Sequence, residues 1–154
     1  MFKINLLFLA LIMGIELSLG VMVAPVIFNA SNYLGSDVLS LFQSGILMSQ
    51  IFVQFGYVLL FVSGFNFLYE LYCVFKVEQN FKIKFSKFLL SCIVLVLSLL
   101  FVFYFMNYIL QNQTIEGVNT KEFYSMHSAS ETTMKIILLC QVFLFFLSFK
   151  IANK

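Results

Sequence analysis

The fold is decided by residues 4–28, INLLFLALIMGIELSLGVMVAPVIF, an apolar run with one carboxylate, Glu16, near its middle. As an α-helix, these 25 residues reach about 37 Å, enough to cross a hydrocarbon core of about 30 Å. A signal peptide is the alternative, because Lys3 precedes the run. The apolar region of a signal peptide is shorter, at about 7 to 15 residues, and carries no central carboxylate. We therefore predict a membrane span.

The composition of the whole chain agrees with a membrane protein. Hydrophobic residues make up 62% of the 154 residues and charged residues only 10%, against about 25% in a soluble domain. The net charge is +2 and the Lys residues are scattered, which argues against nucleic acid as a partner. Cys73, Cys92 and Cys140 lie in apolar runs without CxxC spacing, so we predict small, buried, unreactive side chains.

Three further apolar runs follow the first, and we predict an all-α membrane protein, an antiparallel bundle of four transmembrane helices that forms one domain over residues 1–154. The predicted spans are 4–28, 46–75, 88–110 and 133–150, with the second and fourth helices extending outward from about residues 38 and 121. Ser36 and Asp37 are predicted to start the second helix. Asn119 and Glu122 have the spacing of a capping box for the fourth helix.

The Lys residues predict the orientation of the bundle. The segment 76–87 carries four Lys and one Glu, and the positive-inside rule places it in the cytoplasm together with both termini. Seven Lys then lie inside (3, 76, 82, 84, 87, 150 and 154) and two outside (121 and 135).

Polar residues within the predicted spans form a candidate intramembrane cluster. Glu16 lies about 18 Å above the inner start of its helix, and the same count brings Ser98 and Gln141 to its depth. A carboxylate at the bilayer centre costs about 2.5 to 3.5 kcal/mol, so we expect Glu16 to face the bundle, neutral and hydrogen-bonded. Gln54 joins this cluster from a stripe predicted to face protein, which comprises Gln50, Gln54, Tyr57, Phe61 and Gly64. Helix packing and a substrate or proton path are both open interpretations.

His127 and Glu131 form a second candidate cluster on the outer side. Spaced one turn apart, they suit a metal ion or a proton pair, and His127 suits a haem axial position. Glu131 followed by Lys135 also suits a surface ion pair. A closed metal site needs more ligands, and Asp37 is a further acid that folding could bring near them. We expect His127 and Glu131 to point into the bundle, on the helix face of Met134, Leu138 and Gln141.

Three short motifs carry a resemblance to a known family. They are Gly20-x-x-x-Ala24-Pro25-x-x-Phe28, Gly45-x-Leu47 with Phe52-x-x-Phe55-Gly56, and Phe123-x-x-Met126-His127-x-x-Ser130. The first also predicts close helix packing at Gly20 and Ala24 and a kink at Pro25. The sequence resembles a bacterial four-helix inner-membrane family, domain of unknown function 4149, related to eukaryotic transmembrane protein 205. The chain has neither the Trp nor the Arg expected near the first span, and it lacks the extra His and Arg of the more distantly similar copper-resistance and haem-biosynthesis membrane proteins.

This resemblance implies a multi-pass protein of the bacterial inner membrane with no assigned activity. We favour a binding or transport-accessory protein, surrounded by the lipid bilayer, for which another membrane protein or a second copy is a candidate partner. We expect no cofactor and assign no catalytic residue, because phosphate-loop, hydrolase and thiol redox motifs are missing. The alternatives are a membrane redox or haem- or metal-binding enzyme, and a structural subunit of a membrane complex.

Overall fold

The computed structural model describes residues 1–35, 38–76 and 80–152, with side chains as far as Phe149. The regular elements in these ranges are all helical. The first span consists of α1 (Phe2–Ser18), the π-helical turn η1 (Leu19–Val23) and α2 (Ala24–Phe28), and the short α3 (Ala30–Leu34) follows it. The second span is α4 (Leu41–Lys76). The third consists of α5 (Phe81–Leu100), the π-helical η2 (Phe101–Met106) and α6 (Asn107–Asn112). The 3₁₀ turn η3 (Gly117–Asn119) follows it, and α7 (Lys121–Ala152) contains the fourth span.

Four of these helical segments are long and apolar enough to cross a membrane, which confirms the predicted count of spans. They are Phe2–Phe28, Leu41–Lys76, Phe81–Asn112 and Lys121–Phe149. The third helix begins seven residues earlier than the predicted residue 88, because the Asn80 side chain accepts a hydrogen bond from the Lys82 backbone nitrogen at 3.1 Å. This cap starts α5 within the basic segment, so Lys82 and Lys84 lie on a helix rather than in a loop.

The second helix begins at Leu41, later than the predicted residue 38. Ser40 and Gln43 explain this start, because they form a capping box. The Gln43 nitrogen donates to Ser40 Oγ at 3.2 Å, and the Ser40 nitrogen donates to Gln43 Oε1 at 2.9 Å. The predicted caps at residues 36 and 37 lie outside the described residues.

The fourth helix begins where predicted, but a different residue caps it. Thr120 Oγ1 accepts a hydrogen bond from the Phe123 nitrogen at 3.2 Å. Asn119, the cap predicted from the sequence, instead donates from its side chain to the Ile115 carbonyl at 3.1 Å. Thr120 therefore replaces Asn119 as the residue that satisfies the first turn of α7.

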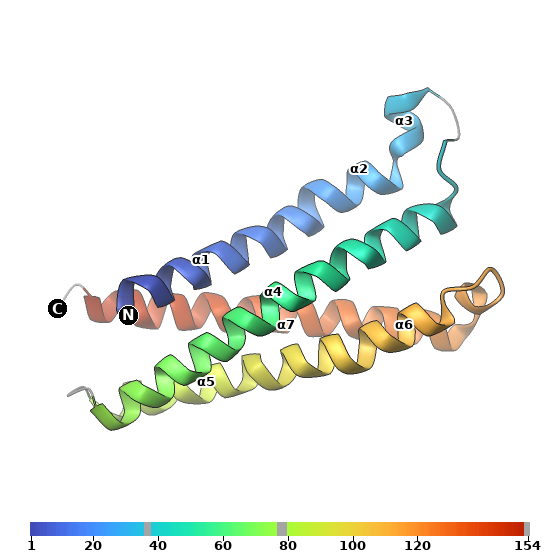
Figure 1. Cartoon of the computed structure of the whole chain (residues 1–154). Coiled ribbons are helices and arrows are strands. Elements are labelled where there is room, and N and C mark those ends of the chain that lie inside the picture. The colour runs from blue at the N-terminus through green and yellow to red at the C-terminus, as the bar shows by residue number, and fades with distance from the viewer. Residues whose placement is uncertain (36–37, 77–79, 153–154) are drawn as a thin grey trace.

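The start of α1 and the described end of α7 lie at the same end of the molecule, opposite the end that carries α3 (Figure 1). Helix α1 packs against α4 and α7, and α5 packs against α4 and α7. Toward the end with α3, the first span diverges from α7, while α2 keeps its contact with α4 (Figure 1). Residues of the first span and of α7 both line the cavity in which the candidate site lies.

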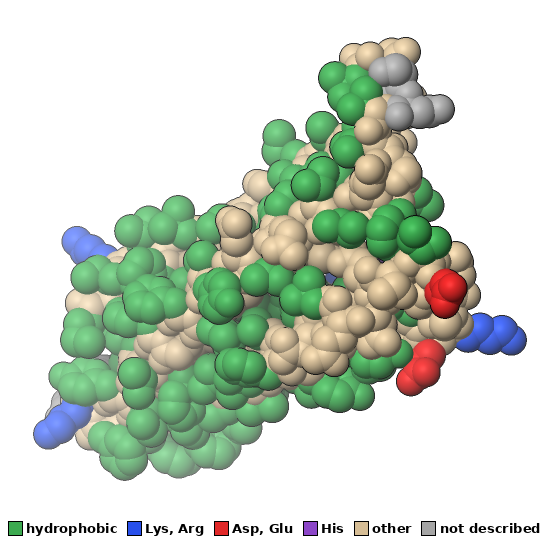
Figure 2. Space-filling view, turned by 45° about the vertical axis from the view of Figure 1, so that its right-hand side comes forward, with side chains coloured by type: hydrophobic (Ala, Val, Ile, Leu, Met, Phe, Trp, Pro, Cys, Tyr) green, Lys and Arg blue, Asp and Glu red, His purple; other side chains and the backbone are tan. Residues whose placement is uncertain are grey.

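The core between the four helices is apolar at its centre and contains Ile12, Leu59, Val94 and Ile137, one residue from each span. Hydrophobic side chains also cover much of the outer surface, and charged side chains lie toward the ends of the face shown in Figure 2. An apolar exterior of this kind fits lipid as the surrounding solvent.

The prediction that the stripe of α4 faces protein is wrong. Gln50, Gln54, Tyr57 and Phe61 are all exposed, with Tyr57 68% and Phe61 64% accessible. The buried face of α4 instead combines small or polar residues with larger apolar ones: Ser44, Met48, Ser49, Phe55, Gly56, Leu59, Val62, Ser63, Asn66, Tyr69, Glu70 and Cys73. Small residues are buried because they allow close helix contact, and polar residues because lipid offers them no hydrogen-bond partner.

The predicted close packing at Gly20 is also wrong. A Cβ added at Gly20 would meet no atom within 4 Å, whereas one added at Gly56 would lie 3.0 Å from Val102 Cγ2. Gly56, on α4, is therefore the glycine that brings two spans close together. At Pro25 the helix adjusts through the π turn just before it, where the Ala24 nitrogen bonds the Leu19 carbonyl, five residues back.

Candidate functional site

A cavity of about 810 Å³ lies between the first span, α4, η2–α6 and α7. Its walls are mainly apolar, and the rings that line it are Phe28, Phe42, Phe52, Phe101, Phe123 and Tyr124. Both π turns contribute to the walls, η1 through Gly20 and Val21 and η2 through Phe101 and Met106. The Gly20, Ala24 and Phe28 positions of the predicted packing motif thus line a cavity instead of a helix contact.

Glu16 is the deeply buried acid of this cavity. Its side chain lines the cavity and the residue is only 8% exposed. Its Oε2 atom has no hydrogen-bond partner among the described residues, so the predicted hydrogen bond is not found at that oxygen. An unpaired buried oxygen is unfavourable, and leaves one acceptor free to interact with a molecule that enters the cavity.

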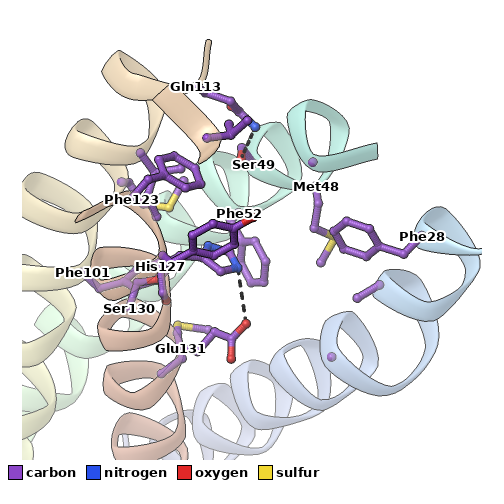
Figure 3. A pocket seen from close by; sticks show the side chains of 18 of the residues that line it. Phe28, Met48, Ser49, Phe52, Phe101, Gln113, Phe123, His127, Ser130 and Glu131 are labelled. Carbon is purple, nitrogen blue, oxygen red and sulfur yellow. Dashed lines mark hydrogen bonds and ion pairs between the residues drawn. The ribbon is translucent and has the colours of Figure 1, made fainter. Parts of the chain in front are cut away.

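His127 and Glu131 lie on the α7 wall of the same cavity. His127 Nε2 is 3.3 Å from Glu131 Oε1, and the Phe123 ring stacks on the imidazole with a centroid distance of 6.3 Å (Figure 3). Lys135 Nζ lies 3.7 Å from Glu131 Oε2, which gives the predicted ion pair. The side chains of His127 and Glu131 are 51% and 56% exposed, so they border the open part of the cavity.

The acidic and basic groups of this site do not form a complete metal-binding set within the described ranges. No three His, Cys, Asp or Glu side chains there lie close enough together to hold a metal ion. Asp37, the further acid that the sequence offers as a ligand, lies outside the described residues. Near the open end, Gln113 Nε2 donates to Ser49 Oγ at 3.1 Å and links α4 to the segment after α6 (Figure 3).

The four residues of the predicted intramembrane cluster have separate environments. Gln54 is exposed on α4, and Glu16 lines the cavity. Ser98 Oγ donates to the Val94 carbonyl at 2.7 Å and lies 3.0 Å from Ser63 Oγ. Gln141 is 1% exposed, and neither its amide nitrogen nor its oxygen has a hydrogen-bond partner within the described structure. The structure therefore does not join these four residues by direct hydrogen bonds.

Two buried polar contacts near the end with the termini are absent from the sequence-based prediction. Glu70 Oε2 lies 3.1 Å from Lys87 Nζ, with the two side chains 0% and 2% exposed. Asn66 Nδ2 donates to Asn5 Oδ1 at 3.0 Å. Lys87, predicted to lie in a basic cytoplasmic loop, is thus buried in an ion pair. The signal for this pair is Glu70 itself, a second carboxylate within an apolar run that needs a nearby cation.

Comparison with known families identifies a match for most of the chain. The family described as a domain of unknown function, DUF4149, matches residues 7–116, which include Glu16, both π turns and the α4 wall of the cavity. No curated protein and no solved structure matches the chain. Because the matched residues form well over half of its length, this multi-span membrane protein belongs to the DUF4149 family.

Proposed function

We propose that this integral membrane protein binds a small, largely apolar molecule in its cavity and acts as a binding or transport-accessory protein. The observation that carries the proposal is Glu16, whose Oε2 is buried without a partner from the described residues while its side chain lines an 810 Å³ cavity. Leaving a buried polar group unpaired costs about 1 to 3 kcal/mol in proteins. A ligand with a polar group at Glu16 offsets this cost.

The walls of the cavity support a ligand with an apolar body. Ligand sites are concave and mainly apolar, with a few polar groups that fix orientation, and this cavity has that character. The first span and α7 both line the cavity and diverge at this end (Figure 1), and we propose that a molecule already dissolved in lipid enters between them. An apolar molecule of this kind needs no passage through water to reach Glu16.

We also propose that the four spans form an antiparallel bundle in a bacterial inner membrane, with both termini inside and the cavity on the outer side. The Lys distribution supports this orientation, because six Lys remain on the inner side after the buried Lys87 is removed from the count, against two outside. The three resemblance motifs support the bacterial inner membrane and the relation to eukaryotic transmembrane protein 205.

Cysteine labelling tests the orientation. In a background without Cys73, Cys92 and Cys140, we expect Glu116→Cys to react with a membrane-impermeant maleimide in intact cells. We expect Lys82→Cys to react only after permeabilisation, because both positions are exposed but lie at opposite ends of the third span. Labelling of Lys82→Cys alone in intact cells reverses the proposed orientation.

Filling the cavity tests the binding function. Gly20 and Gly14 both lie in the first span with no atom within 4 Å of an added Cβ, but only Gly20 lines the cavity. We expect Gly20→Leu to reduce the occupancy of a co-purifying small molecule by roughly tenfold or more, whereas Gly14→Leu retains it. Native mass spectrometry of protein released from mild detergent measures this occupancy.

Thermal unfolding of the same two variants separates binding from folding. Because neither added side chain meets a neighbour at its Cβ, we expect both variants to unfold near the wild-type temperature once ligand is removed. Equal occupancy in the two variants, or a wild-type protein that carries no small molecule when isolated directly from membranes, contradicts the proposed function.

A further inference from the structure

We propose that the ligand of the cavity is a lipophilic organic cation. This inference rests on the proposed function, since it names the chemical class that the same cavity accepts. It combines two independent features of the lining, its aromatic side chains and its distribution of charge.

Aromatic side chains line all four walls of the cavity. Phe28 comes from the first span, Phe52 from α4 and Phe123 from α7. Phe52 meets Phe101 of η2 in an edge-to-face arrangement, with centroids 6.3 Å apart and planes at 74°. Aromatic faces carry a partial negative charge and attract organic cations, so rings on several sides of one cavity favour a ligand whose positive charge is spread over apolar groups.

The acidic and basic side chains of the lining also favour a cationic ligand. They are Glu16 on α1 and His127, Glu131 and Lys135 on α7, and the α4, η2 and α6 walls contribute none. Lys135 and His127 both lie beside Glu131, at 3.7 and 3.3 Å. Glu16 has no such cation beside it among the residues described. A cationic ligand can therefore pair with Glu16. An anionic ligand would meet the Glu16 carboxyl group, and the two basic side chains of the lining, His127 and Lys135, already lie beside Glu131.

Binding of a cation at Glu16 also requires a proton to leave. A carboxyl group buried in apolar surroundings without a counter-ion is favoured in its neutral form. When the cation arrives, the Glu16 O–H bond breaks, the proton passes to solvent and the carboxylate pairs with the ligand. Apparent affinity therefore rises with pH. His127, Glu131, Lys135 and Tyr124 also line the cavity, so the dependence is assigned to Glu16 only by comparison with a Glu16 variant.

Two ions of the same shape and opposite charge test the proposal. Full-length protein in lipid nanodiscs is dialysed against tetraphenylphosphonium or tetraphenylborate, and uptake by protein-free nanodiscs is subtracted. We expect the cation to bind roughly tenfold or more tightly than the anion. Glu16→Gln should lose roughly tenfold in cation affinity, whereas Glu122→Gln, an acid of α7 outside the cavity lining, should bind as wild type does.

Proton release by the wild-type protein gives a second measurement that needs no variant. In weak buffer we expect about one proton to be released for each tetraphenylphosphonium bound. Equal binding of the two ions, preference for the anion, or cation binding without proton release overturns the cation proposal. If Gly20→Leu still abolishes binding in those cases, the cavity remains a ligand site of another class. If Gly20→Leu changes no binding, the proposed function falls with it.

Discussion

Glu70→Leu is expected to lower the free energy of unfolding by about 3 to 5 kcal/mol, while adding Lys87→Met to the same chain restores most of that loss. The two groups are 3.1 Å apart and almost fully buried, so removal of the carboxylate leaves a buried ammonium without its counter-ion. Two apolar side chains of similar size leave no buried charge at all. The free energy of unfolding of the double variant is therefore expected to be close to that of the wild-type protein.

Unfolding in mixed micelles titrated with dodecyl sulfate measures these differences. Lys87→Met alone should cost less than Glu70→Leu alone, because a carboxyl group can take up a proton and become neutral. Lys82→Met serves as the control, since Lys82 is an exposed lysine of the first turn of α5, and it should change stability by less than about 0.5 kcal/mol. Losses that simply add in the double variant would show that the ion pair is not the source of the effect.

Unlike Glu70→Leu, the Glu16→Leu variant is expected to stabilise the ligand-free protein and to abolish ligand binding in the cavity. An apolar side chain at this position eliminates the unpaired buried oxygen, so the free energy of unfolding should rise by about 1 to 3 kcal/mol. Ligand occupancy should fall by roughly tenfold or more, because the polar anchor of the cavity is lost.

Ile12→Ala provides the comparison for this second variant. Ile12 lies one turn earlier on α1 and is fully buried in the apolar core, so its truncation should cost about 2 to 5 kcal/mol. Dodecyl sulfate titration of ligand-free protein and native mass spectrometry give the two readouts. If Glu16→Leu instead lowers the free energy of unfolding by as much as Ile12→Ala does, Glu16 has a structural role.

The spans can be predicted from sequence because long apolar runs are required by the thickness of the bilayer. The helix starts are less predictable, since they depend on which of several neighbouring polar residues forms the cap. Ser40 caps α4 and Thr120 caps α7, whereas the sequence predicts Asn119 as the cap of α7. A cap is decided by local geometry, and Ser, Thr, Asn and Asp are near-equivalent in sequence.

The orientation of α4 is the main failure of prediction, and it has a physical cause. Gln50 and Gln54 predict a buried face because they are amides within an apolar helix, yet both lie on the exposed side. The stripe of Ser63, Asn66, Glu70 and Cys73 marks the buried face through spacings of three and four residues. Its members are small or form buried contacts, whereas Gln50 and Gln54 lie in the half of this 36-residue helix that begins at Leu41.

The cavity could not be predicted from sequence. Gly20 and Ala24 have the spacing of a helix contact, yet both line the cavity, and a Cβ added at Gly20 would meet no atom within 4 Å. The burial of Glu16 does follow from the cost of placing a carboxylate in lipid. Its unpaired oxygen depends on which side chains surround it, and no pattern within one helix determines that.

An experimental structure of the protein, crystallised from a lipid mesophase after extraction without delipidation, tests the central claim most directly. The measurement is the electron density in the part of the cavity that Glu16 lines. We predict density for a non-protein molecule in contact with the Glu16 carboxyl group, between the first span and α7. A first span packed against α7, with the cavity filled by side chains and Glu16 hydrogen-bonded within the chain, would contradict the account.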